Sequence, residues 1–500
     1  MNLRATLFFF MAILLLGLFL RFHQVDQESL WVDEILTIQH ALKDSPAEVV
    51  EKVSQREGAP FGHYLLLHYW IKIFGSAEFA TRLLSVMFGV LSIAVLFLIA
   101  DLLFGTKVAL ISSLFMATSM LQVLYSQETR LYAMFTFLSL SSAYFFTKIY
   151  LGELRSPNNQ KMFCWYFLYF ISAIASIYTN YLAGFILLGY TFVLFWNWEK
   201  IKFIFPRWAA VHGIIALFSL PLISIILTQL DSIGNNAELT FTIFGVPPFI
   251  AQLGLLMFAL PMLFLISFLA AAVLCKRKIK RIIKLILRSG DLPPTLFLLV
   301  VVLFSAAYTY LVFFPLSVFG IPIFRVPITH SYFLIRHSFF MAPILYLFFA
   351  YHISRIPKKI ATAAFCIILL TNVLALAAYY SETTKAEWGE AAAYIHEHDG
   401  SKPLILLDRG GSTNAYLLEY YLGYKPRMIK LTKSPRGQPL WKIKPQNLFE
   451  SLENEHTFWL ILSGNRETEQ HYKEVLQRKY ALVESRQFYE VSVYRYENNN

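Results

Sequence analysis

Two adjacent carboxylates, Asp33 and Glu34, follow the first long apolar block of this 500-residue chain. A third acid, Glu128, stands two residues before Arg130 in the segment YSQETRLY, residues 125–132. A carboxylate can act as general base toward a hydroxyl group, and a guanidinium can bind phosphate through two parallel hydrogen bonds. The simpler alternatives are an acidic pair that only solvates the end of a loop and a Glu–Arg pair that only neutralises a helix end.

Three carboxylates that share one poorly hydrated site repel each other, which raises the pKa of at least one unless a cation lies among them. Either Arg130 supplies that charge, or a divalent cation such as Mg²⁺ or Mn²⁺ does, bound by Glu34 and Glu128. Adjacent side chains on a helix point about 100° apart. We therefore expect different tasks for the neighbouring acids, with Asp33 facing the reacting centre and Glu34 holding a loop or a cation.

Long apolar blocks carry these residues. The chain is 57% hydrophobic and 15% charged, whereas a soluble chain is about a quarter charged, and blocks of roughly 20 apolar residues span a bilayer. The composition predicts a polytopic α-helical membrane protein with about 11 transmembrane helices. The predicted helices are 5–22, 80–103, 107–125, 131–149, 162–179, 182–197, 208–228, 248–274, 295–318, 337–354 and 360–380.

The distribution of charge gives an orientation in the membrane. Residues 381–500 contain 16 basic and 16 acidic side chains, so the net charge of +11 lies in residues 1–380. There it is concentrated in alternate short loops, which favours orientation in a bilayer over nucleic-acid binding. The bias predicts a cytoplasmic N-terminus in the cell membrane, a first extracytoplasmic loop at 23–79 and an extracytoplasmic tail.

The first loop and the tail are predicted to be structured. Ser45, Pro46 and Glu48 form the start of a capped amphipathic helix, and further short helices are expected at 32–42 and 63–74. The tail is predicted to be one small α/β domain. Its expected strands are 404–407, 458–462 and 488–496, with a helix after the first of them.

Further polar residues are candidates for a binding site. Arg336 and His337 stand where the helix 337–354 begins, and a helix N-terminus beside a guanidinium suits a phosphate. Arg21 and Arg82 are interpreted as interfacial anchors. His63, Tyr64 and Tyr132 are possible substrate-site residues. The spacing of His63 and His68 favours packing over a metal pair.

Three segments carry a resemblance to a known family: LWVDEILTI, HYLLLHYWIKIFGSAEFATRLLSVMFGV and YSQETRLYAM. They resemble the bacterial membrane glycosyltransferases of the GT-C fold that are related to protein O-mannosyltransferases and to the aminoarabinose transferase of lipid A. The resemblance is dense over 28–150 and looser through Arg336 and 385–395. The chain departs from the family at Pro60-Phe61, where two prolines are common, and at Arg336-His337, where Arg-Tyr is common.

The resemblance implies transfer of a sugar from a polyprenyl-phosphate donor to a glycan, lipid or protein acceptor, with inversion. It implies Asp33 as general base. Glu34 and Glu128 complete the candidate catalytic set, and Arg336, Arg130 and His337 are the candidates for binding the phosphate. A transporter or flippase is the rival, disfavoured because ionisable residues are scarce in mid-helix. A non-catalytic lipid-binding assembly factor stays open, as do the sugar, the acceptor, the lipid length and metal dependence.

Overall fold

The computed structural model describes most of the chain outside one long internal segment. The described residues are 2–155, 161–196, 202–229, 342–399, 403–407, 412–430, 455–463 and 466–498, with positions 231, 340, 449, 452 and 453. The predicted helices at 248–274 and 295–318 lie outside the described residues.

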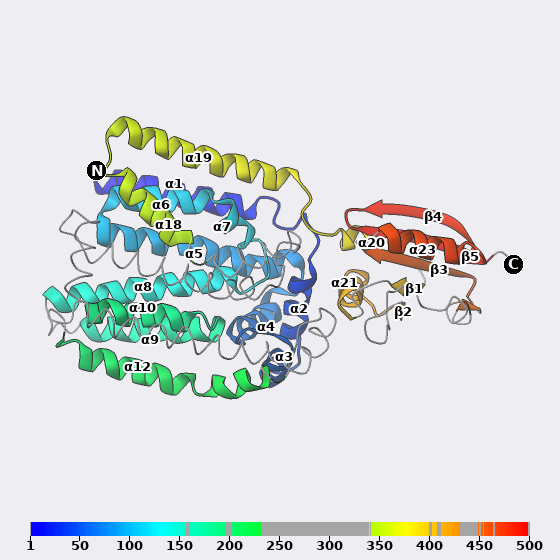
Figure 1. Ribbon diagram of the computed structural model, residues 1–500, viewed down its shortest axis with the longest axis horizontal. Helices are drawn as coiled ribbons and strands as arrows, with labels where there is room; N and C mark the ends of the chain where they lie inside the picture. Colours follow the sequence, from blue (N-terminus) through cyan, green and yellow to red (C-terminus); the bar gives the residue numbers. More distant parts are fainter. Residues whose placement is uncertain are drawn as a thin grey trace, which may run out of the picture.

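The rest of the predicted membrane helices are present as a bundle of roughly parallel helices (Figure 1). They are α1 (Leu3–Phe22), α5 (Glu78–Phe104), α6 (Thr106–Thr118), α7 (Met120–Leu124), α8 (Tyr132–Arg155), α9 (Lys161–Thr179), α10 (Ala183–Trp196), α12 (Phe205–Ser219), α18 (Ala342–Ile353) and α19 (Lys358–Ser381). The block predicted as one helix at 107–125 breaks at Ser119, where ψ is 120° and the backbone is extended. Its second part, α7, leads directly into the loop that carries Glu128 and Arg130.

Within the described ranges, four helices are long and apolar enough to cross a membrane, namely α1, α5, α9 and α19. A fifth candidate joins α12 to the helix Pro221–Gln229 across a bend of 51°. Side chains such as Phe163, 78% exposed, and Ile367, 63% exposed, face outward. Large apolar side chains without protein cover are expected where lipid replaces water.

Three short helices lie at one end of the bundle: α2 (Val32–Ala41), α3 (Pro46–Arg56) and α4 (Gly62–Phe74). The helices expected in the first loop are thereby confirmed. The Ser45 hydroxyl accepts a hydrogen bond from the Glu48 backbone nitrogen at 3.3 Å, and Pro46 occupies the first turn of α3. This cap fixes where α3 starts, and its buried Val49 and Val53 pack against Tyr64 of α4.

Beyond these helices, the last part of the chain forms a five-stranded sheet in the order β2-β1-β3-β5-β4. β1 pairs in parallel with β2 and β3, and β5 pairs antiparallel with β3 and β4. The elements are α20 (Trp388–His398), β1 (Leu404–Leu407), α21 (Ser412–Leu422), β2 (Arg427–Lys430), β3 (Thr457–Ser463), α23 (Arg466–Leu476), β4 (Tyr480–Phe488) and β5 (Val491–Asn498).

The prediction of one strand over 488–496 is wrong. The chain turns at Tyr489 and Glu490, so that Phe488 ends β4 and Val491 begins β5. Glu490 has a φ of 57°, a conformation more usual for Gly or Asn. The alternating pattern continues on both sides of this turn, and the turn itself contains no typical turn residue.

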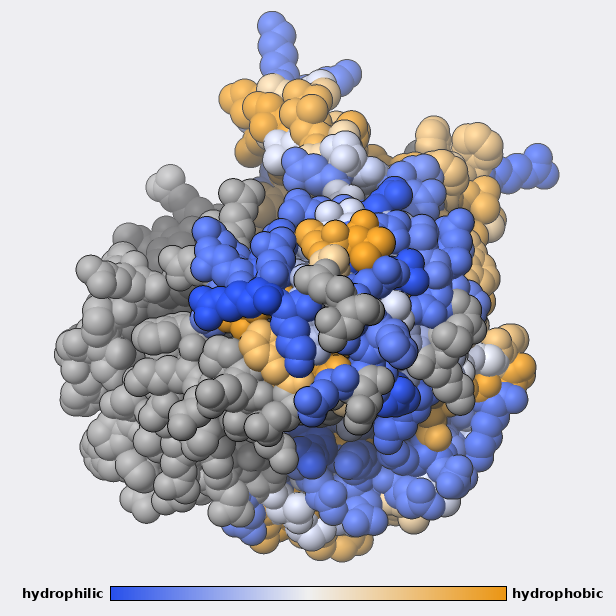
Figure 2. Space-filling model, turned by 90° about the vertical axis from the view of Figure 1, so that its right-hand side faces the viewer, coloured by the Kyte–Doolittle hydropathy of each residue, from blue (hydrophilic) through white to orange (hydrophobic). Residues whose placement is uncertain are grey.

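The sheet domain and the first-loop helices share one hydrophobic core. Leu30, Ile35 and Ile38 belong to the same buried cluster as Trp388 and Leu418. Seen from the end that carries the sheet domain, the described surface is mostly hydrophilic, and many of its hydrophobic residues appear toward the edges (Figure 2). The two parts therefore form one continuous structure at this end of the bundle.

Candidate active site

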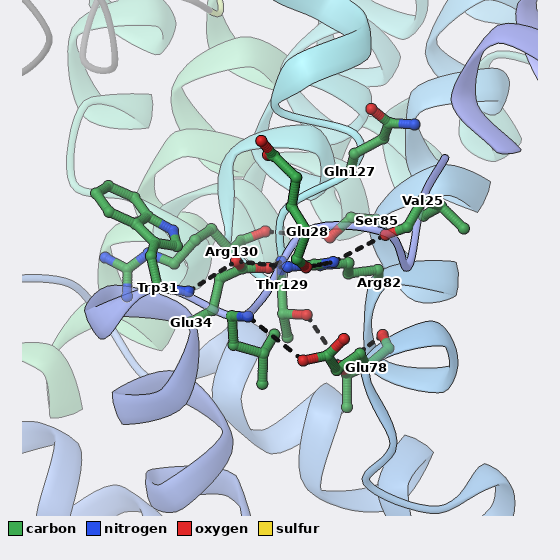
Figure 3. A network of polar contacts seen from close by, with 12 residues as sticks. Val25, Glu28, Trp31, Glu34, Glu78, Arg82, Ser85, Gln127, Thr129 and Arg130 are labelled. Atoms are coloured by element: carbon green, nitrogen blue, oxygen red, sulfur yellow. Dashed lines mark hydrogen bonds and ion pairs between the residues drawn. The ribbon is translucent and has the colours of Figure 1, made fainter. Parts of the chain in front are cut away.

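The carboxylate of Glu34 lies at the centre of a buried polar network (Figure 3). Arg82 of α5 binds it bidentately, from Nε to Oε1 and from Nη2 to Oε2, each at 3.0 Å. Lys385 Nζ donates to Oε2 at 2.8 Å, and the Thr129 backbone nitrogen donates to Oε1 at 2.8 Å. The Trp31 backbone nitrogen caps the start of α2 through Oε2 at 3.4 Å.

Arg82 uses its whole guanidinium in this network. Besides Glu34 it donates to the backbone carbonyls of Val25 at 2.9 Å, Glu28 at 2.8 Å and Ser29 at 3.3 Å. Burial by itself raises the pKa of Glu34, but the charges and hydrogen bonds of Arg82 and Lys385 outweigh it and lower the pKa to about 2. Glu34 is therefore ionised at neutral pH.

The interpretation of two arginines as interfacial anchors is wrong. Arg82 is 1% exposed and Arg21 is fully buried. Arg21 donates to the backbone carbonyls of Gly17 at 3.0 Å and Ala117 at 3.2 Å and to the Ser126 hydroxyl at 3.2 Å. The first guanidinium balances a carboxylate and the second ties α1 to α6, so neither extends to the lipid headgroups.

Lys385 is a site residue that the sequence reasoning did not single out. It lies between α19 and α20, 351 positions from Glu34. A signal was available, because Lys385 opens the segment KAEWGEAAAYI.

A second polar cluster lies around Arg130 and the backbone of Asp33. Arg130 Nη1 donates to the Asp33 carbonyl at 3.1 Å and to the Thr37 hydroxyl at 2.7 Å. Thr37 in turn donates to the same carbonyl at 2.7 Å. Asp33 is half-buried, and its charge acts on Arg130. In Figure 3, the Arg82 and Arg130 side chains lie on opposite sides of Glu34.

The remaining members of this second cluster come from α2, from the residue that follows α3 and from α4. His40 Nε2 lies 3.4 Å from Glu57 Oε1. Burial raises the pKa of Glu57, but the hydrogen bond from His40 and the charge of Arg130 outweigh it, so that pKa ends below its ordinary value. Burial, with the charge of Arg130, lowers the pKa of His63 to about 3. His63 is therefore neutral at pH 7.

Two polar atoms of this cluster stand out. Among the described residues, Arg130 Nε and His63 Nδ1 are buried without a hydrogen-bond partner. Tyr64 is fully buried beside them, and the Tyr132 ring centroid lies 5.9 Å from Arg130 Cζ. Buried polar groups are nearly always satisfied. The unpaired donor of Arg130 therefore makes this cluster a candidate site for a ligand.

Three carboxylates are predicted to lie together. The structure shows this only for Asp33 and Glu34, which are neighbours in the first turn of α2. Glu128 is 4% exposed and acts electrostatically on Tyr379 of α19. In the part of the chain that the structure describes, there is no group of three or more His, Cys, Asp or Glu side chains that could hold a metal ion. Both oxygens of Glu34 accept hydrogen bonds from cations, so Glu34 does not fit the role of a metal ligand here. Arg336 and His337 lie outside the described residues.

A hydrophilic cavity of about 160 Å³ adjoins the Glu34 network. It lies between the segment after α1, the loop before α8 and the segment between α19 and α20. Amide, hydroxyl and carboxyl side chains line it, and Lys385 forms part of its wall. The lining residues are Gln24, Gln27, Glu28, Ser29, Gln127, Tyr379, Tyr380, Ser381, Glu382, Thr383, Lys385, Glu387 and Glu390.

The apolar spans, the short helices and the sheet domain at one end together define a polytopic membrane protein. Its structure resembles ArnT from Cupriavidus metallidurans bound to undecaprenyl phosphate, with a TM-score of 0.57 and 13% identity, covering 99% of this chain and 98% of that chain. At this identity the likeness establishes the fold, which is that of GT-C glycosyltransferases.

Part of the sequence agrees with this likeness. Residues 58–224 match the family described as dolichyl-phosphate-mannose-protein mannosyltransferase. No curated protein matches the chain. The resemblance stated from the sequence is thus confirmed: the chain resembles ArnT in fold and matches the protein mannosyltransferase family over residues 58–224.

Two more solved structures are similar at lower scores. ArnT from Cupriavidus metallidurans in the apo state has a TM-score of 0.44 and 14% identity, covering 97% of this chain and 97% of that chain. The Archaeoglobus fulgidus oligosaccharyltransferase tethered with an acceptor peptide has a TM-score of 0.49 and 12% identity, covering 98% of this chain and 74% of that chain.

Proposed function

We propose that the protein transfers a sugar from a polyprenyl-phosphate donor to an extracytoplasmic acceptor, with inversion and with Asp33 as general base. The acceptor is a glycan, a lipid or a protein. The protein then lies in the cell membrane with a cytoplasmic N-terminus, and the sheet domain lies outside with the first-loop helices. That the ArnT structure contains undecaprenyl phosphate supports a lipid-linked donor.

One observation carries the proposal: an incompletely satisfied, buried guanidinium lies against the backbone of a carboxylate residue. Arg130 holds the Asp33 carbonyl at 3.1 Å, while its Nε has no partner among the described side chains and backbone groups. A phosphate oxygen is a suitable acceptor for such a donor. The arrangement therefore offers a base and an anion-binding group within one site.

The step needs these two groups in different roles. The Asp33 carboxylate takes the proton of an acceptor hydroxyl, and that oxygen forms a bond to the anomeric carbon of the sugar. The bond from that carbon to the phosphate oxygen breaks, and polyprenyl phosphate leaves with the electron pair. Arg130, and Arg336 as expected from the sequence, would stabilise the negative charge on the leaving phosphate.

The test replaces Asp33 with Asn in the full-length protein, reconstituted in lipid nanodiscs. The substrates are radiolabelled polyprenyl-phosphate hexoses and pentoses, with the envelope fraction of cells that lack the protein as acceptor. Removing a general base costs roughly 10²- to 10⁴-fold in turnover. We expect such a loss in Asp33→Asn, with the melting temperature of the protein unchanged.

The same assay separates the proposal from its rivals. A flippase would move the lipid-linked sugar across the bilayer without cleaving it, and an assembly factor would bind it without turnover. Full activity of a folded Asp33→Asn variant would remove Asp33 from the role of base while leaving the glycosyltransferase activity in place.

A further inference from the structure

Lys385 is a second cation on a carboxylate that Arg82 already binds through two hydrogen bonds. Its ammonium lies 2.8 Å from Glu34 Oε2, and its side chain is 8% exposed. Removing an ammonium from water is costly even in a relaxed protein site. Since the pair of Arg82 and Glu34 is complete in charge and geometry without it, Lys385 is not needed to neutralise Glu34.

The segment around Lys385 is fixed to both parts of the molecule. The Thr384 hydroxyl donates to Glu28 at 2.9 Å, which attaches the segment to the chain that follows α1. Glu387 accepts a hydrogen bond from the Tyr489 backbone nitrogen at 2.7 Å, which attaches it to the turn between β4 and β5. Lys385 therefore lies in a segment that is held by both the chain after α1 and the sheet domain.

Glu34 links the position of the sheet domain to the position of Asp33. The two residues are neighbours in the first turn of α2, and Glu34 also caps that turn through the Trp31 nitrogen. The carbonyl of Asp33 is held from the other side by Thr37 and Arg130. A displacement of the Glu34 carboxylate would therefore rotate the first turn of α2 and change the direction of the Asp33 side chain.

We propose that Lys385 is a positioning residue for Asp33. Its ammonium joins the first turn of α2 to the sheet domain, so that Asp33 is aligned for proton transfer only when this domain is seated. The inference rests on the proposed function, in which Asp33 is the base. The sheet domain would then contribute to catalysis by fixing the position of Asp33.

The experiment compares Lys385→Met with Lys385→Arg in the full-length protein in nanodiscs. Lys473→Met is the matched control, because Lys473 makes a Lys–Glu contact of the same 2.8 Å length to Glu469 within the sheet domain. Three quantities are measured for each variant: turnover at saturating polyprenyl-phosphate sugar, the KM for that donor, and hydrogen exchange of the backbone amides in residues 31–37.

A misplaced catalytic group can lower turnover by roughly 10- to 100-fold. We expect a fall of this size in Lys385→Met, with the donor KM unchanged within about twofold and with faster exchange at 31–37. Lys385→Arg is expected to restore most of the turnover and the slow exchange. Lys473→Met is expected to match the wild type in all three measurements.

Unchanged turnover and unchanged exchange in Lys385→Met would overturn the inference while the proposed function stands. An equal loss of turnover in the Met and Arg variants, with exchange at 31–37 like that of the wild type, would also overturn it. If the wild-type protein cleaves no polyprenyl-phosphate sugar, the proposed function is wrong and a catalytic role of Lys385 with it. Hydrogen exchange then still shows whether Lys385 holds α2.

Discussion

The two buried polar clusters on either side of Glu34 differ in how completely their groups are satisfied. Around Glu34, both carboxylate oxygens and the guanidinium of Arg82 have partners within the protein. Around Arg130, the guanidinium Nε and His63 Nδ1 have none among the described residues. A network whose polar groups are all paired, here called closed, fixes the geometry of its members. A network with unpaired groups, here called open, can still bind a substrate.

This difference separates the tasks of neighbouring acids. Asp33 and Glu34 are adjacent in the sequence, yet Glu34 faces two cations and Asp33 lies beside the open cluster. The contrast predicts that changes in the closed cluster affect stability first, and that changes in the open cluster affect donor binding first.

The largest expected effect on stability comes from Glu34→Gln. The substitution leaves the cations of Arg82 and Lys385 buried without their anion, and breaking a buried ion pair in this way costs about 3–5 kcal/mol. Denaturant unfolding in detergent micelles measures it. Glu469→Gln, which removes the acid of a half-buried pair, is the control and is expected to cost less than about 1 kcal/mol. Similar losses in both variants would contradict a closed cluster.

Arg130→Met tests the open cluster. We expect the affinity for polyprenyl phosphate to fall by roughly 10- to 100-fold, which corresponds to about 1.4–2.8 kcal/mol, because a charge-assisted contact to phosphate is lost. Titration of the nanodisc-embedded protein with a fluorescent polyprenyl phosphate measures it. Arg427→Met, which changes an exposed arginine of β2, should leave the affinity unchanged. Unaltered affinity in Arg130→Met would place the phosphate elsewhere.

A pH dependence distinguishes the two clusters further. The pKa of His63 is lowered to about 3 in the fold, so the unfolded chain binds a proton near pH 6.5 that the folded chain does not bind. The stability is complete above about pH 6.5 and falls as the pH falls toward 3, by roughly 2 kcal/mol at pH 5. Glu34, with a pKa lowered to about 2, keeps its contribution down to about pH 4.5.

The loss between pH 7 and pH 5 should therefore shrink in His63→Gln and remain in Glu34→Gln. Unfolding measured at the two pH values for the three proteins tests this. An equal loss in wild type and His63→Gln would contradict a buried neutral imidazole.

The smallest expected effect is at the surface of the sheet domain. Arg427 Nη2 lies 2.5 Å from Glu455 Oε1, but the Arg427 side chain is 62% exposed. Replacement of either residue by Ala should change the free energy of unfolding by less than about 1 kcal/mol, and added salt should reduce the difference. A larger cost would show that geometry alone, without burial, can produce an effect of the size expected at Glu34.

Local patterns were sufficient for much of the fold. The capping sequence at Ser45 identified α3, and the apolar blocks identified the described membrane helices. The break at Ser119 has no Gly or Pro to mark it, and the turn at Tyr489 and Glu490 lacks the usual turn residues. Both depend on tertiary packing, which the periodicity of a short window does not contain.

The candidate site was predictable only in part. Asp33 and Glu34 attract attention as an acidic pair at the end of an apolar block, and Arg130 stands in a short loop. The partners of Glu34 are Arg82, 48 positions away, and Lys385, 351 positions away. No local signal joins residues so distant. Without such a signal, Arg82 is interpreted as arginines at a membrane interface usually are, namely as an anchor, and this interpretation is wrong.

The hydrophobic core shared by α2, α4 and the sheet domain has a consequence for biosynthesis. Ile35 and Leu67 pack in the same cluster as Trp388 and Leu418, and Lys385 is made 351 residues after Glu34. At about 5–20 residues per second, the ribosome needs roughly 20–70 seconds for that stretch. For that time the apolar faces of the first-loop helices lack the side chains of the sheet domain on which they pack. A chain that stops before α20 therefore lacks part of the core in which its first-loop helices pack.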